Sequence, residues 1–252
     1  MSVHVLYEGL PAKFEHDYLS WPSCACVRSG GINILFDTGF ATQRQRLPQR
    51  LRETVGLAPQ DIHLVVLSHL HYDHAYNFDL FPHARIVAHN REIDHALHGA
   101  SDEFAYQDFL TRAIADSGRL EGVEEGYSPA PGVSVLFVPG HTPGCLALLL
   151  EEADAPPTVL AGDAVKNLAE LATGRMPMVT LPEAAAASIR KIRRQVAVVV
   201  PGHDRILHVF PDRIEAAEGS PLNLVYAAGC VPPGSSDRVA LNLPASALPI
   251  VP

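Results

Sequence analysis

The chain has 252 residues, which suits one large domain whose hydrophobic core needs no disulfides or metals for support. Its 47% hydrophobic and 19% charged residues exclude a disordered chain, and no segment approaches the roughly 18 continuous apolar residues of a membrane span. The formal net charge of −9, from 19 basic and 28 acidic residues, argues against nucleic acid as a partner.

The N-terminal residues lack the basic start and long apolar stretch of a secretory signal. We interpret the four cysteines, Cys24, Cys26, Cys145 and Cys230, as small buried hydrophobic residues of a reduced chain. We therefore expect a cytoplasmic protein that acts on a small molecule and binds neither nucleic acid nor membrane. A homodimer is compatible with the sequence.

The first part of the chain predicts short strands and one helix. Strands are expected at residues 3–9, 24–30 and 32–39, with the Gly30-Gly31 pair as a hairpin turn between the last two. Residues 41–57 carry leucines at helical spacing among charged residues, with Pro48 early, and predict an amphipathic helix.

Further strands and helices alternate along the rest of the chain. Residues 61–69 form an apolar run typical of a strand buried on both faces. Beyond it we predict strands at 84–90, 132–141, 157–164 and 196–204, two helical stretches within 90–117, and a helix at 181–195 that begins with Pro182. We assign residues 1–219 to one domain and residues 220–252 to an irregular, Pro-rich C-terminal tail packed on the same domain.

One pattern recurs: an apolar strand is followed at once by histidine or aspartate. The segment "SHLHYDH" at 68–74 is the densest case. His69 and His71 leave the same face of an extended chain, whereas His71 and His74 meet if the chain turns helical there. The residues at such strand ends are His69, His71, Asp73, His74, His141, Asp163 and His203.

Imidazole nitrogens and carboxylate oxygens together suit zinc, and also manganese, iron or cobalt. Because one zinc ion needs about four ligands, these residues are too many for one ion and about right for two. The natural division gives three nitrogens to one ion, one carboxylate and two nitrogens to the other, and one shared carboxylate. Two such ions hold a bridging water that is hydroxide near neutral pH.

"HLHYDH" at 69–74 resembles the His-x-His-x-Asp-His signature of the metallo-β-lactamase superfamily, and "GHTPG", "GDA" and "GHD" resemble its later ligand-bearing segments. The resemblance implies an α/β (α+β) fold, the αββα sandwich, in which two mixed β-sheets are flanked by helices. It also implies that His69, His71 and His141 hold the first metal, that Asp73, His74 and His203 hold the second, and that Asp163 bridges them. By the same resemblance, Asp37 supports the site from behind the ligands.

The segments look most like the branch of N-acyl homoserine lactonases and related ester hydrolases. They depart from that branch where Tyr76 and Asn77 replace two glycines and where Lys166 replaces a tyrosine. The resemblance implies a dinuclear hydrolase in which a metal-bridging hydroxide attacks the carbonyl of a lactone or carboxylic ester, an acyl homoserine lactone among them. We expect two divalent ions, with zinc favoured, and catalytic roles for Asp73, which orients the nucleophile, and Lys166.

Several alternatives stay open at this point. Lys166 either stabilises an oxyanion or a substrate carboxylate, or is a surface lysine. Tyr72 and Tyr76 either line the pocket or pack behind it. A thioester hydrolase of the glyoxalase II kind shares the seven ligands, but its C-terminal region usually carries basic residues, and this tail has only Arg238 after Arg213. A non-catalytic metal-binding sensor on the same fold is the other alternative.

Overall fold

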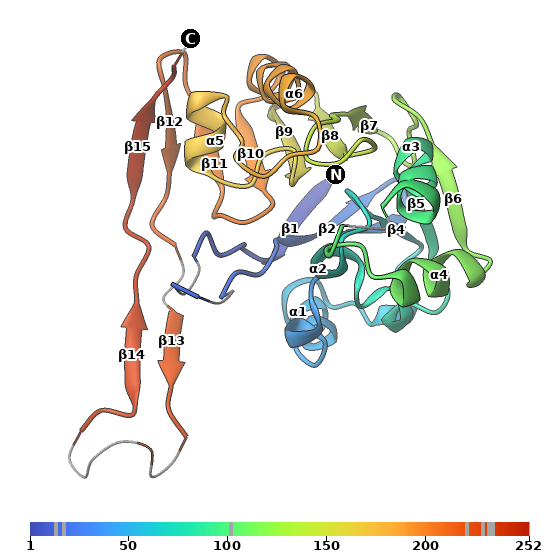
Figure 1. Ribbon diagram of the computed structural model, residues 1–252, viewed down its shortest axis with the longest axis horizontal. Coiled ribbons are helices and arrows are strands. Elements are labelled where there is room, and N and C mark those ends of the chain that lie inside the picture. Colours follow the sequence, from blue (N-terminus) through green and yellow to red (C-terminus); the bar gives the residue numbers. More distant parts are fainter. Residues whose placement is uncertain are drawn as a thin grey trace.

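Two β-sheets lie face to face at the centre of the molecule, and helices cover their outer faces (Figure 1). The computed structural model describes residues 1–12, 15–16, 19–100, 103–219, 222–227, 230 and 235–251. The first sheet contains, in spatial order, β1 (Ser2–Tyr7), β2 (Cys24–Ser29), β3 (Ile32–Phe36), β4 (Leu64–Val66), β5 (Arg85–His89) and β6 (Leu120–Val123). Strands β1 to β3 are antiparallel, and β3 to β6 are parallel, so this sheet is mixed.

The second sheet is also mixed. Its spatial order is β15 (Ser246–Pro249), β12 (Arg213–Ala216), β11 (Leu207–Val209), β10 (Val198–Pro201), β9 (Ala155–Gly162), β8 (Leu146–Glu152) and β7 (Val133–Phe137). Only the β9–β10 pair is parallel, and the other pairs are antiparallel. The ends of β4, β7, β9 and β10 lead into the polar segments singled out in the sequence.

The period-two alternation of strands divides the core into three layers. Ile34 and Val66 of the first sheet face Leu148 and Leu160 of the second, and this apolar layer fills the space between the sheets. Their neighbours in the chain, such as Leu35, face the other way and pack under helices. This arrangement confirms the predicted αββα sandwich.

The helices bury one apolar stripe each. On the first sheet lie α1 (Leu47–Val55), α2 (Tyr72–Ala75), α3 (Asn90–Asp94) and α4 (Asp108–Asp116), and on the second lie α5 (Leu168–Thr173) and α6 (Pro182–Gln195). In α6 the buried residues Ala185, Ser188, Ile189 and Ile192 follow helical spacing. Pro182 is at the start of α6, as predicted, because a helix leaves its first N–H groups unpaired in any case.

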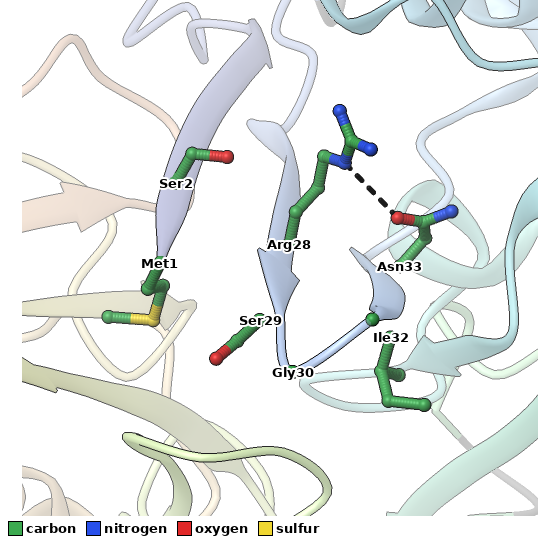
Figure 2. Close-up of a pocket in the computed structure, with 8 residues that line it drawn as sticks. Met1, Ser2, Arg28, Ser29, Gly30, Ile32 and Asn33 are labelled. Atoms are coloured by element: carbon green, nitrogen blue, oxygen red, sulfur yellow. Dashed lines mark hydrogen bonds between the residues drawn. The ribbon is translucent and has the colours of Figure 1, made fainter.

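The Gly30-Gly31 hairpin is confirmed. Both glycines have positive φ, 56° and 81°, as a tight two-residue turn requires, and Ser29 pairs with Ile32 across it. Figure 2 shows the hollow beside this turn, where Arg28 Nε donates a hydrogen bond to Asn33 Oδ1 at 3.3 Å. The hollow lies at the start of β3, whereas the polar segments lie at the far ends of the strands, so it is separate from them.

Some predictions differ from the structure. The helix expected over 41–57 begins at Leu47, after a 3-10 turn at Ala41–Gln43. The tail is not irregular throughout: β13 (Leu222–Val225) pairs with β14 (Arg238–Leu241), and β15 joins the second sheet beside β12. The high proline content of the tail had led us to predict irregular structure where these short strands lie. Cys24, Cys26 and Cys145 are buried as predicted, but Cys230 is exposed because it lies in the tail, away from the core.

Several elements were not foreseen, namely β6, β8, β11, β12 and α5. No helix within the described residues is long and apolar enough to span a membrane. The division of the chain at residue 220 stays a prediction.

Candidate metal centre

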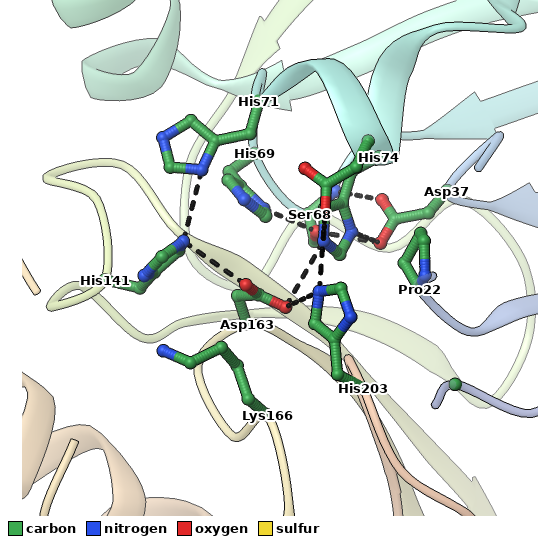
Figure 3. A network of polar contacts seen from close by, with 12 residues as sticks. Pro22, Asp37, Ser68, His69, His71, His74, His141, Asp163, Lys166 and His203 are labelled. Carbon is green, nitrogen blue, oxygen red and sulfur yellow. Dashed lines mark hydrogen bonds and ion pairs between the residues drawn. The ribbon is translucent and has the colours of Figure 1, made fainter. Parts of the chain in front are cut away.

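All seven residues predicted from the strand ends come together at one place. Figure 3 shows His69, His71, His74, His141, Asp163 and His203 around this centre. One potential ligand atom from each of His69, His71 and His141 lies within 4.8 Å of the others. The same holds for Asp73, His74 and His203. We call these the three-histidine group and the mixed group.

The local conformation of residues 69–75 explains how one short segment serves both groups. His71 is extended, with φ −63° and ψ 148°, and the chain becomes helical directly after it, at Tyr72–Ala75. The His74 backbone N–H donates to the His71 carbonyl at 3.1 Å and closes this turn. The extended part directs His69 and His71 to one group, and the helical turn directs Asp73 and His74 to the other.

Asp163 contacts both groups. Its Oδ1 lies 3.2 Å from Nε2 of His74 and 3.3 Å from Nε2 of His203, while its Oδ2 lies 3.3 Å from Nε2 of His141. Asp73 reaches only the mixed group, with Oδ2 at 3.4 Å from Nε2 of His203. A carboxylate with one oxygen on each side has the arrangement that a shared ligand needs.

The histidines are oriented as metal ligands are. His69, His74 and His203 each place Nδ1 near an oxygen, of Ser68 (2.9 Å), Asp37 (2.8 Å) and Ser20 (2.7 Å) respectively, so Nε2 faces the centre. His141 Nδ1 lies 3.0 Å from the carbonyl oxygen of Met178. Such partners fix the tautomer and the direction of the free lone pair.

Unsatisfied polar atoms indicate what belongs at the centre. In the described part of the chain, Nε2 of His69, Nε2 of His74 and Oδ1 of Asp163 are buried without a hydrogen bond. The latter two lie 3.2 Å apart but without hydrogen-bonding geometry. Because a buried polar atom without a partner costs about 1–3 kcal/mol, this cluster fits bound cations better than a structural role. His71 differs, since Nδ1 lies 3.2 Å from Nε2 of His141 and Nε2 is the buried atom without a partner.

The two groups differ in charge when no ion is bound. Burial lowers the pKa of His69 well below its usual value, that of His71 to about 3, and that of His141 as well. In the mixed group burial also opposes the charged form, but Asp163 and the carboxylates beside it outweigh this. The pKa of His74 is therefore raised well above its usual value, and that of His203 to about 9.

Both carboxylates are ionised. Burial works against this, but His74 and His203 lower the pKa of Asp73 to about 2, and the pKa of Asp163 falls well below its usual value for the same reason. The three-histidine group thus offers neutral nitrogens. In the mixed group, His74 and His203 must each release a proton before they can bind a cation.

Asp37 lies directly behind the ligands, where the resemblance implied it. Its carboxylate accepts from the Ser68 backbone N–H at 2.7 Å, from Ser68 Oγ at 2.8 Å and from His74 Nδ1 at 2.8 Å. Its φ of 57° is the only positive value among described residues other than glycine. Aspartate tolerates this left-handed conformation better than most residues.

Lys166 is not a surface lysine. Its side chain is buried, and Nζ lies 3.3 Å from Oε1 of Glu170 and 3.4 Å from the carbonyl of Met178. Figure 3 shows its amine beside Asp163, on the His141 side. Helix α5 explains this position, because Glu170 in its first turn also accepts from the Lys166 backbone N–H at 2.8 Å.

Asn77 and Tyr76, which depart from the lactonase pattern, and the nearby Tyr72 have structural partners. Asn77 is fully buried, and its side-chain amide donates to the carbonyls of Thr38 and Phe40, each at 2.9 Å. Tyr72 and Tyr76 are half-buried and lie within 5.2 Å and 6.1 Å of the Phe40 ring. The asparagine therefore ties the loop after β3 to the segment that follows α2.

Three supporting residues escaped the sequence analysis. Ser20 contacts His203, Ser68 contacts His69, and Glu92 accepts a hydrogen bond from the Leu70 backbone N–H at 2.8 Å. Only Ser68 lies in the histidine-rich segment. Nothing in the sequence around Ser20 or Glu92 distinguishes them from other polar residues.

Two glycines allow neighbouring loops to approach the centre. A Cβ on Gly202 would lie 2.1 Å from Oδ1 of Asp163, and a Cβ on Gly162 would lie 2.4 Å from the Ser68 Cβ. Gly162 also has a φ of 51°, which disfavours a side chain. The positions of Asp163 and Ser68 therefore depend on glycine at 202 and 162 respectively.

The fold and the side chains at the centre together place this protein in the class of metal-dependent hydrolases. The pattern of the Metallo-beta-lactamase superfamily matches residues 22–203, and the chain belongs to this family. An N-acyl homoserine lactonase from a Bacillus species is 31% identical over 206 residues, covering 77% of this chain and 79% of the relative. The family, the fold and the resemblance to the lactonase branch are thereby confirmed.

Solved structures show the same fold at lower identity. A variant of AiiA from Bacillus thuringiensis, with N-decanoyl-L-homoserine bound at its active site, superposes with a TM-score of 0.62 at 23% identity, over 76% of this chain and 87% of that one. AidC, a dizinc quorum-quenching lactonase, has a TM-score of 0.63 at 20% identity, over 77% and 78%.

Proposed function

We propose that this protein hydrolyses a lactone or carboxylic ester at a centre of two divalent metal ions. The observation that carries the proposal is the position of Asp163, which has one oxygen against each of the two groups. Two further observations support the proposal. Potential metal-ligand atoms are buried there without hydrogen bonds, and the chain is similar to N-acyl homoserine lactonases. Zinc is favoured, because tetrahedral sites of histidine and carboxylate suit it.

The three-histidine group would hold one ion, the mixed group the other, and Asp163 would bridge them. When bound, such ions lower the pKa of water toward neutrality and polarise a carbonyl oxygen. The chain's own contribution begins with Asp73, whose Oδ2 lies at the edge of the mixed group and is ionised. There it accepts a hydrogen bond from the attacking water and orients it. Water adds to the carbonyl carbon, the acyl C–O bond breaks, and the released oxygen takes the proton that the water gives up. In an ester this oxygen leaves as an alcohol, and in a lactone it stays on the ring-opened product as a hydroxyl group.

Lys166 is the second residue of the chain to which we assign a role in the reaction. Its Nζ is a cation beside the centre, held by Glu170 and the Met178 carbonyl. A fixed cation stabilises negative charge that develops on the carbonyl oxygen, or binds a carboxylate carried by the substrate. Acyl homoserine lactones are the first substrates to test.

The test is a substrate panel with matched variants. The purified protein with Zn²⁺ is offered acyl homoserine lactones, simple lactones, aryl esters, thioesters and phosphodiesters. We expect hydrolysis of lactones, and expect H71A and D163A to lose bound metal and activity together. His83→Ala, on the loop before β5, is the control and should keep both.

Each other result has a distinct meaning. Full lactone hydrolysis by a metal-free preparation would refute the proposal. Preference for thioesters would favour a glyoxalase II type of hydrolase, and two bound ions without turnover of any ester would favour a sensor.

A further inference from the structure

One buried carboxylate near the centre does not face it. Glu92 of α3 is fully buried, and its carboxylate accepts three hydrogen bonds. The donors are the Leu70 backbone N–H at 2.8 Å, the Tyr106 hydroxyl at 2.7 Å and the Thr142 hydroxyl at 2.6 Å. The first two bind Oε1, and the third binds Oε2.

Each donor adjoins a different part of the three-histidine group. Leu70 lies in the chain between His69 and His71, and Thr142 directly follows His141. The Tyr106 ring packs edge-on against the His71 ring, with centroids 4.5 Å apart. No donor to Glu92 adjoins His203, Asp73 or His74. The Glu92 carboxylate therefore links the residues beside the three-histidine group, whereas other residues support the mixed group.

The backbone shows that this connection is tight. A Cβ on Gly144 would lie 2.1 Å from the Glu92 backbone nitrogen, so the loop that carries His141 rests directly on α3. The histidine-rich segment belongs to the first sheet and this loop to the second. Glu92 joins the two sheets at the point where their histidines must meet.

We propose that Glu92 is the positioning residue of the three-histidine group, and that its three hydrogen bonds set the affinity of the ion held there. The inference rests on the proposed two-ion site. It predicts that loss of any one donor weakens one ion and leaves the other unchanged. A general structural role would weaken both or neither.

The decisive variants are Thr142→Val and Tyr106→Phe, because each removes one hydroxyl and keeps the carboxylate and the side-chain volume. Both Zn²⁺ dissociation constants of the loaded protein are measured by competition with a coloured chelator. We expect one constant to weaken about 10- to 100-fold, the usual effect of losing a partner behind the ligands, and the other to stay within about 2-fold.

Thr111→Val is the matched control. Thr111 of α4 is a buried threonine whose hydroxyl has no hydrogen-bond partner among the described residues. The same substitution there should leave both constants unchanged. Ser20→Ala provides the converse case: it removes the hydroxyl 2.7 Å from Nδ1 of His203 and should weaken the other ion. The double variant with Thr142→Val should then weaken both.

Two substitutions of Glu92 test the carboxylate itself. In Glu92→Gln the amide oxygen still accepts from Leu70 and Tyr106, and the amide nitrogen donates to the Thr142 hydroxyl oxygen, so all three connections are kept. The hydroxyl hydrogen of Thr142 then turns toward Cys145 Sγ, which lies 3.2 Å away. We expect this variant to bind two ions within about 3-fold of the original affinity. Glu92→Leu leaves three buried donors unpaired and should lose one ion. If it does not fold, Thr142→Val and Tyr106→Phe still decide.

The inference is overturned if Thr142→Val and Tyr106→Phe bind both ions as the unaltered protein does, or if they weaken both ions equally. Because the readout is metal binding, it is independent of the substrate. If the unaltered protein hydrolyses no ester but the two variants lose one ion selectively, the role of Glu92 is sustained and the proposed function is rejected. If the unaltered protein hydrolyses lactones but the two variants keep both ion affinities, the proposed function is sustained and the role of Glu92 is rejected.

Discussion

Oδ2 of Asp37 lies 2.8 Å from Nδ1 of His74, and both side chains are almost wholly buried, with 1% and 0% of their surface exposed. The imidazole Nδ1–H donates to the carboxylate, so Nε2 is the nitrogen that faces the centre and would bind an ion after it releases its proton. In the chain, α1 and the whole of β4 lie between the two residues. The pair thus couples the end of β3 to the mixed group.

Asp37→Asn should weaken metal binding and activity about 10- to 100-fold. Asparagine also accepts the positive φ, so the backbone is kept. Its amide nitrogen, however, faces either the Ser68 N–H, which is also a donor, or His74 Nδ1, which would then carry its proton on Nε2. The measurement is Zn²⁺ affinity together with kcat/KM. Asp61→Asn, at an exposed turn, should change neither, and an unaltered Asp37→Asn protein would contradict the assignment.

Removal of the ions should lower the stability of the fold. The buried ligand atoms without hydrogen bonds would then stay unsatisfied, and an ion present at about 1,000 times its Kd contributes about 4 kcal/mol to the free energy of unfolding. We expect a clear fall in Tm in the presence of a chelator and full recovery when Zn²⁺ is restored. Equal Tm values in both states would show that no ion is held at this centre.

The metal-free protein should lose stability on the alkaline side. Asp163 and Asp73 raise the pKa of His203 to about 9, above its usual 6.5, because they favour the charged ring. The contribution of this ring is complete below pH 6.5 and disappears as the pH rises through about 9. His74, raised for the same reason, acts in the same direction. The two carboxylates titrate far lower and do not affect this window.

Urea unfolding of the chelator-treated protein between pH 6 and 10 measures this change. The free energy of unfolding should decline across the interval, and His203→Asn should flatten the profile. Metal binding should show the opposite trend, since His203 must lose a proton to bind an ion. A metal-free protein that grows more stable between pH 6.5 and 9 would contradict the ion pairs assigned to His203.

Lys166→Met should separate the two roles of the amine. If Nζ stabilises the developing oxyanion, kcat falls on the order of 100-fold for neutral lactones and KM changes little. If it binds a substrate carboxylate, KM rises for acidic substrates alone. Both ions should stay bound in either case. Lys191→Met, which removes an amine paired with Glu125 at the surface, is the control. Unchanged kinetics on all substrates would leave Lys166 without a catalytic role.

The sequence predicts the centre better than its surroundings. The histidines of residues 69–74 share one short segment, and local rules on extended and helical spacing suffice to direct them, as the structure shows. Asp163 and His203 follow apolar strands, so their position at a sheet edge also follows from pattern. Which ion each residue holds came from the family resemblance.

Supporting residues could not be predicted because their partners are distant in the chain. Glu92 gathers donors from residues 70, 106 and 142, and only the folded sheets bring these together. The burial of Lys166 depends on α5 and on the Met178 carbonyl, neither of which the sequence indicated. In the tail, β15 pairs with β12 across an intervening hairpin, and its proline content suggested irregular structure instead.

The glycines at 162 and 202 limit how this protein can be redesigned. Oδ1 of Asp163 and the Ser68 Cβ already occupy the room that a methyl group at these positions would require. Libraries made to seek new substrates should therefore keep glycine at both positions. In drifting lineages, too, both positions should stay glycine, because any side chain there would displace Asp163 or Ser68.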